Sequence, residues 1–153
     1  MPRLFVVDTS VVVSGVVGRN DASPPVLLLN AVVTGRLPFV VSADLLAEYR
    51  RVLTRPRIAA RHGLPPSKVD ALLAQLTMTA YLRQPPDDDA PDADDPLPDS
   101  LPGDEHIIRL LAHEPCAALV SGDQVLLDAV RGWRDVLTSA ELVALLGLTP
   151  PAV

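Results

Sequence analysis

Apolar runs and amphipathic stretches alternate along the chain and predict strands and helices in turn. Short apolar runs typical of buried strands occupy residues 4–7, 37–41, 117–120 and 136–137. Helical spacing of apolar side chains, or helix-start signals, mark residues 24–36, 43–54, 67–82, 104–114, 124–130 and 139–146. This order predicts an α/β fold with a central parallel sheet of about four to five strands and helices on both faces.

Several helix ends carry recognisable signals. Ser23 precedes two prolines and is a predicted N-cap, Ser42 is predicted to cap the next helix, and Pro56 is predicted to end it. Thr138 and Glu141 have the spacing of a capping box. We find no internal repeat, so we expect one domain over residues 1–149.

Composition favours a folded protein of the cytoplasm. Hydrophobic residues make up 48% and aromatic residues only 3%, which predicts a core of Val, Leu, Ile and Ala. The one cysteine, Cys116, excludes an internal disulfide. Asp8 interrupts the first apolar run, unlike a signal peptide. The longest uncharged stretch, residues 22–35, is shorter than the roughly 20 residues of a membrane helix, so we expect no membrane segment.

The negative charge is concentrated in one Pro-rich insert, residues 84–103. The formal net charge is −6, and the insert holds seven aspartates and no basic residue. Without those seven the charge is −6 + 7 = +1, so the body of the protein is almost neutral. Outside the insert, five arginines lie close together at positions 50, 51, 55, 57 and 61. Arginine is well suited to phosphate recognition.

Four acids from distant segments are predicted to meet at one edge of the sheet. Asp8 and Asp123 follow predicted strands, Asp104 starts the helix before the Asp123 strand, and Glu48 lies in the helix after residues 37–41. In open α/β sheets the functional crevice lies beyond the carboxyl ends of the strands. Several carboxylates in one place repel each other strongly. An all-oxygen cluster of this kind favours Mg²⁺ or Mn²⁺ as the neutralising cation.

Each acid, taken alone, also has a structural explanation. An aspartate at a strand end often caps a helix or forms a turn, and a helical glutamate is often merely solvated. We expect His106 and His113 at the surface, because no spacing in the sequence makes a zinc site.

Four segments together resemble the PIN domain family. They are "VVDTSVVVSG", "VVSADLLAEYRRVLTRPRI", "PGDEHIIRLLA" and "ALVSGDQVLLDA", and the similarity continues to "VLTSAELVALLG" near the C-terminus. The sequence is most similar to the toxin components of bacterial toxin–antitoxin systems (VapC-like). The resemblance implies a single Rossmann-like PIN domain and a metal-dependent ribonuclease.

The resemblance also implies roles for individual residues. The family's catalytic and metal-binding acids fall on Asp8, Glu48, Asp104 and Asp123. The first, third and fourth of these acids would hold one or two divalent ions, and Glu48 would ligate or orient a water. Hydrolysis would leave a 3′-hydroxyl and a 5′-phosphate.

Substrate contacts and partners follow from the same likeness. Candidate substrate-binding residues are Ser10, Ser121, Arg51 and Arg55. The two arginines would share a helix face if the helix continues through residue 55. Expected partners are RNA, a cognate antitoxin protein and a second copy of the chain in a homodimer.

Two departures from the family pattern leave an alternative open. Gly103 and Val125 stand where related sequences often carry further acids, which favours a single-metal site or weakened catalysis. The alternative is a PIN module of reduced activity that binds RNA or a protein partner. A phosphatase using Asp8 as nucleophile would usually need a second acid at the position of Ser10, and a receiver domain would need an acidic pair and a late lysine.

Overall fold

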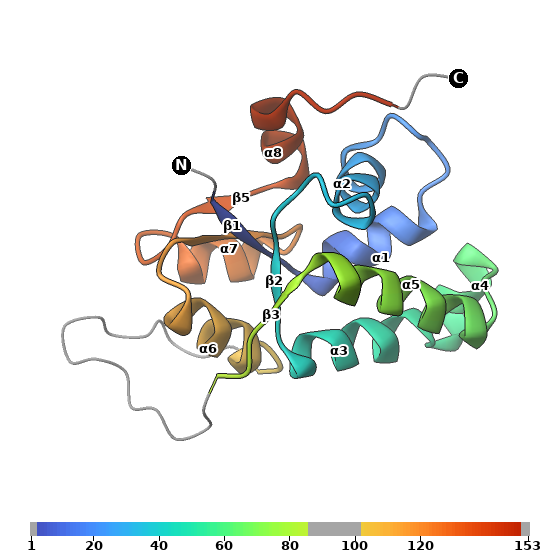
Figure 1. Ribbon diagram of the computed structural model, residues 1–153, viewed down its shortest axis with the longest axis horizontal. Coiled ribbons are helices and arrows are strands. Elements are labelled where there is room, and N and C mark those ends of the chain that lie inside the picture. Colours follow the sequence, from blue (N-terminus) through green and yellow to red (C-terminus); the bar gives the residue numbers. More distant parts are fainter. Residues whose placement is uncertain (1–2, 86–101, 151–153) are drawn as a thin grey trace.

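Short parallel strands form the centre of the molecule (Figure 1). The computed structural model describes residues 3–85 and 102–150. One sheet has the order β1-β4-β5, and a second pairs β2 with β3. The strands are β1 (Leu4–Val7), β2 (Val40–Val41), β3 (Tyr81–Leu82), β4 (Ala117–Val120) and β5 (Val136–Leu137). A parallel bridge between Phe5 and Phe39 joins the two sheets, so the strands follow one another as β3-β2-β1-β4-β5.

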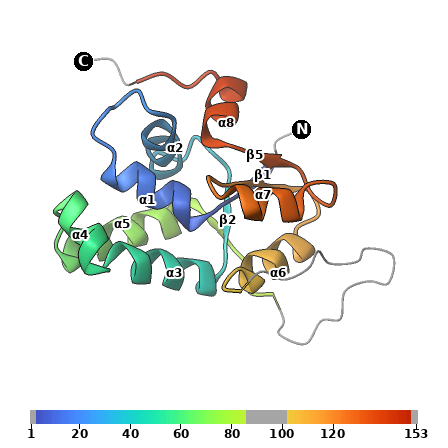
Figure 2. The same cartoon turned by 180° about the vertical axis from the view of Figure 1, so that it is seen from behind.

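Helices connect successive strands and pack around the sheet. They are α1 (Thr9–Val17), α2 (Pro24–Val33), α3 (Ala43–Leu53), α4 (Pro56–His62), α5 (Pro66–Thr79), α6 (Glu105–His113), α7 (Gln124–Val130) and α8 (Ser139–Leu146). Figures 1 and 2 both show α1, α3, α4 and α5 on one side of β2, and α6 and α7 on its other side. No helix in the described ranges is long and apolar enough to cross a membrane.

The strand order creates a switch point beside β1. The chain passes from β1 to β2 on one side, and later enters β4 on the other side of β1. Ligands of open α/β sheets bind where the strand order reverses in this way, beyond the carboxyl ends of the strands. The carboxyl ends of the paired strands β1 and β4 therefore mark the edge at which a ligand of this fold is expected.

A continuous aliphatic core holds these elements, in agreement with the composition. Helices α1 and α2 pack closely at Gly15. A Cβ at this position would lie 2.8 Å from the carbonyl oxygen of Pro25 and 2.9 Å from Cβ of Leu29. Such distances are below van der Waals contact, so only glycine lets the two helices approach this closely.

Most predicted elements are confirmed. The strands at 4–7, 117–120 and 136–137 and the helix at 124–130 have the predicted limits. Ser42 caps α3 by accepting a hydrogen bond from the N–H of Leu45 at 3.1 Å. The capping box of Thr138 and Glu141 is present at the start of α8.

Other predictions were wrong or incomplete. The sequence pattern did not predict α1, because its valine-rich run is typical of strands. Residues 67–82 end as strand β3 rather than helix, and Tyr81 is 50% exposed instead of packed in a helical stripe. Of the strand predicted at 37–41, only β2 pairs as a ladder.

The helix predicted over 43–54 does not reach the second candidate arginine. Helix α3 ends at Leu53, and Pro56 begins the separate helix α4, which was not predicted. Arg51 lies in the last turn of α3, whereas Arg55 is the N-cap residue of α4, so the two do not share one helix face. Most of the acidic insert predicted at 84–103 lies outside the described residues.

Candidate active site

Three aspartates occupy the N-cap positions of helices around the switch point. Asp8 lies between β1 and α1, Asp104 precedes α6, and Asp123 precedes α7. Only Asp123 uses its side chain as a cap: Oδ1 accepts hydrogen bonds from the N–H groups of Val125 at 3.0 Å and Leu126 at 3.4 Å. The carboxylates of Asp8 and Asp104 make no capping hydrogen bond to the described chain. Helix capping therefore accounts for Asp123 but not for the other two.

Asp8 is buried and held by two hydroxyls. The residue is only 6% exposed. Oδ2 of its carboxylate accepts hydrogen bonds from Ser10 Oγ and Ser121 Oγ, each at 2.8 Å. Ser10 Oγ in turn accepts from the N–H of Gly122 at 3.1 Å, and Ser121 Oγ from the N–H of Asp123 at 2.9 Å. These bonds join the start of α1 to the turn after β4. Both serines therefore orient Asp8, a use of their hydroxyls that the sequence did not indicate.

Glu48 is contacted from three elements. Thr9 Oγ1 on α1 donates to Oε2 of Glu48 at 2.5 Å, and Arg51 on the same helix as Glu48 lies 3.4 Å from Oε1. On α6, His106 places Nε2 at 3.4 Å from Oε2. The glutamate side chain is 15% exposed, so the alternative that Glu48 is merely a solvated helix residue does not hold.

His106 is the residue that the sequence analysis misplaced. We expected it at the surface, but its side chain is only 16% exposed, and both ring nitrogens are buried without a hydrogen-bond partner among the described residues. Its position four residues before the buried Leu110 places both on one face of α6, and this spacing was the available signal. Buried ring nitrogens without a hydrogen bond are uncommon, and Glu48 lies within ion-pair distance of Nε2.

The four acids interact electrostatically. Asp104 has a pKa raised to about 6, first by burial and then by the negative charges of Asp8, Asp123 and Glu48. The nearby His106 partly offsets this rise. The three aspartates at the starts of α1, α6 and α7, together with Glu48 on α3, thus concentrate negative charge at one place, as the strand order requires.

The donors fit a hard divalent cation in type and in charge. All four acids offer carboxylate oxygens, which Mg²⁺ and Mn²⁺ prefer, and a cation would relieve the repulsion that raises the pKa of Asp104. Within residues 3–85 and 102–150, however, no three acidic, histidine or cysteine side chains are close enough together to enclose a metal ion. The chemistry of the donors therefore supports a metal site more strongly than their spacing does.

One known protein family matches most of the chain. A family model described as "PIN domain" matches residues 4–125, which include all four acids. The chain belongs to the PIN domain family. PIN domains are nucleases and generally use divalent metal ions. No curated protein matches the chain.

Two positions where the resemblance implied further acids carry no side-chain oxygen in this PIN domain. Gly103 has a φ of +89°, a backbone conformation that favours glycine, so an acid there would be strained. Val125, in the first turn of α7, is 63% exposed and offers no oxygen ligand. Both differences reduce the number of oxygen donors around Asp104 and Asp123.

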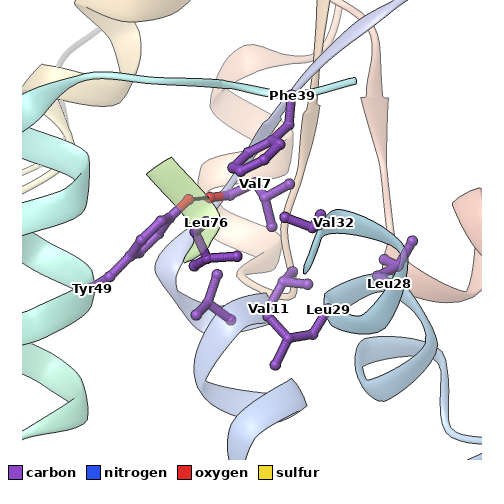
Figure 3. A pocket seen from close by; sticks show the side chains of 9 residues that line it. Val7, Val11, Leu28, Leu29, Val32, Phe39, Tyr49 and Leu76 are labelled. Atoms are coloured by element: carbon purple, nitrogen blue, oxygen red, sulfur yellow. Dashed lines mark hydrogen bonds between the residues drawn. The ribbon is translucent and has the colours of Figure 1, made fainter. Parts of the chain in front are cut away.

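A tyrosine links the two elements that carry Asp8 and Glu48. The hydroxyl of Tyr49 donates a hydrogen bond to the carbonyl oxygen of Val7, as Figure 3 shows. Burial raises the pKa of this phenol well above its usual value, and the charges of Asp8 and Glu48 raise it further. The phenol therefore stays protonated and remains a donor. The apolar cavity beside it has a volume of about 10 Å³, too small for a substrate.

Proposed function

We propose that this PIN domain is a Mg²⁺- or Mn²⁺-dependent endoribonuclease. The observation that carries the proposal is that contacts bring the segments of the acids together in a PIN domain. Ser10 and Ser121 hold Asp8, and Thr9 and His106 contact Glu48. The raised pKa of Asp104 agrees with this grouping, because Asp8, Asp123 and Glu48 contribute to it. Arg51 and His106 both contact Glu48.

The proposed mechanism assigns the acids to two tasks. Asp8, Asp104 and Asp123 would hold one or two ions, directly or through water, and Glu48 would ligate or orient a water. A bound divalent ion supplies charge stabilisation at the phosphate and lowers the pKa of water. Attack of water on phosphorus, with loss of the 3′-oxygen of the preceding nucleotide, would leave a 3′-hydroxyl and a 5′-phosphate.

The remaining residues would position these groups. Ser10 and Ser121 hold Oδ2 of Asp8, which leaves Oδ1 for a ligand. Thr9 and His106 approach one oxygen of Glu48 from either side and restrict its carboxylate. Arg51, exposed beside Glu48, is placed to contact an RNA phosphate. Arg55, the N-cap residue of α4, is also proposed to contact an RNA phosphate.

A cleavage assay tests the activity. The purified protein should cleave structured RNAs when Mn²⁺ is added, and Asp8→Asn should abolish cleavage while the fold is kept, because the amide has the same shape. Asp70→Asn is the matched control, since Asp70 lies on α5 and pairs with Arg50 at the surface. Cleavage by Asp8→Asn at the wild-type rate would refute the assignment of this acid.

A second candidate function has its own support. The missing acids at Gly103 and Val125, and the absence of an enclosed metal site in the described ranges, favour a weakened PIN module that binds RNA or a protein partner. Such a module would hold RNA equally well with Mn²⁺ and with a chelator, and would not cleave it. Binding that requires Mn²⁺ would exclude this candidate.

We further propose that the protein is the toxin of a toxin–antitoxin pair and forms a homodimer in the cytoplasm. The support is the likeness of its motifs to toxin components of this family. A small neighbouring gene for a DNA-binding antitoxin should neutralise the growth arrest caused by expressing this chain. Light scattering of the purified protein should give twice the mass of 16.3 kDa.

A further inference from the structure

An open hollow lies at the end of α1 that is remote from the acids. Its volume is about 440 Å³, and it is formed by the second half of α1, the residues after it, and α4. The lining residues are Val13, Ser14, Val17, Gly18, Arg19 and Arg61. Both views show α1 and α4 next to each other at this place (Figures 1 and 2).

The hollow carries two arginines and no acid. Arg19 and Arg61 are exposed, and neither forms an ion pair or hydrogen bond with another residue of the described ranges. By contrast, two arginines of α3 are paired: Arg50 lies 2.8 Å from Asp70, and Arg51 lies 3.4 Å from Glu48. Two unneutralised guanidinium groups at one hollow favour an anion, and phosphate is the anion that arginine recognises best.

The backbone beside Arg19 is fixed by packing. A Cβ at Gly18 would lie 2.6 Å from Cγ2 of Val26 on α2 and 3.0 Å from the carbonyl oxygen of Ser14. The N–H of Gly18 donates to the same carbonyl at 2.9 Å. The chain therefore leaves α1 in a defined direction, which places the stem of Arg19 at the rim of the hollow.

Helix α1 connects the hollow with the acids. The helix starts at Thr9, directly after Asp8, and its nine residues span about 13 Å at roughly 1.5 Å per residue. An RNA strand that crosses the acids can therefore reach Arg19 and Arg61 only a few nucleotides away from the bond that is cut. A substrate of one phosphodiester cannot reach both places.

We propose that this hollow is a second phosphate-binding site, which holds the RNA backbone a few nucleotides from the cleaved bond. The inference rests on the proposed ribonuclease function, because it takes RNA as the strand that passes along α1. It extends that function by requiring a substrate of several nucleotides.

Salt dependence of RNA binding tests the site. Every variant is made in the Asp8→Asn background, so that the probe, a single-stranded polyuridylate long enough to span α1, is not cut. Removing two phosphate contacts should flatten the slope of log affinity against log salt by about 2 × 0.7 = 1.4 in Arg19→Gln/Arg61→Gln. Arg19→Lys/Arg61→Lys should restore the slope, since a point charge at the same place still pairs with phosphate.

The matched control is Arg36→Gln/Arg131→Gln, which removes the same charge from two exposed arginines outside the hollow. It should leave the slope within error of the parent. An unchanged slope in Arg19→Gln/Arg61→Gln would overturn the proposal. So would a variant that keeps RNA binding but loses binding of a poly-aspartate peptide, since the hollow would then dock an acidic protein segment. A flattened slope in a protein whose wild type cleaves no RNA would reject the nuclease function and keep the phosphate site.

Discussion

The carboxyl group of Asp104 should make stability depend on pH. Its pKa is raised to about 6 in the folded protein, against about 3.9 in an unfolded chain. Between these values the folded state binds a proton that the unfolded state has released, so the free energy of unfolding falls as pH rises through this window. Without metal, the wild type should therefore lose more stability between about pH 4 and pH 7 than Asp104→Asn does.

Thermal unfolding in a chelator, followed at several pH values, measures this difference. The group is partly exposed, so solvent screening reduces its size. Asp104→Asn is the control for the wild type, because every other titrating acid is present in both proteins. Parallel pH curves for the two proteins would show that neither burial nor the charges of Asp8, Asp123 and Glu48 raise the pKa of Asp104.

At the scale of elements, the hydrogen bond of Tyr49 joins α3 to β1. The donor follows Glu48 in α3, and the accepting carbonyl of Val7 directly precedes Asp8. Tyr49→Phe leaves the ring in place and deprives a buried carbonyl of its donor, which should lower the free energy of unfolding by about 1–3 kcal/mol. Urea unfolding measures the loss. Tyr81→Phe is the control, because that side chain is half exposed and should change stability by less than about 0.5 kcal/mol.

At the scale of the whole molecule, metal binding should stabilise the fold. A ligand that binds only the folded state adds about 2.7 kcal/mol at a concentration of 100 times its Kd. For a chain of this size, this corresponds to a rise in Tm of about 5–10 °C. Mn²⁺ should thus raise the Tm of the wild type and of Asp70→Asn, and the rise should be lost in Asp8→Asn. An equal rise in all three proteins would place the bound ions away from the proposed site.

The sequence by itself determined the elements whose signals are local. The apolar runs at 4–7 and 117–120, the caps at Ser42 and Thr138, and the acids at strand ends depend on neighbouring residues only. The parallel α/β architecture followed from their order, because short strands alternating with helices can bury their apolar faces in few ways. The position of the acids at one edge followed from the architecture. Their catalytic role remains a prediction.

The tertiary structure decided the features that depend on contacts between distant residues. Helix α1 has a strand-like valine run, and it is helical where Gly15 lets it pack closely on α2. Ser121 reaches Asp8 across 113 positions, and Tyr49 reaches Val7 across 42. Likewise, the ring nitrogens of His106 are buried where α6 packs beside Glu48. No local pattern encodes such pairs, since the free energy of each contact exists only once the chain has brought both partners together.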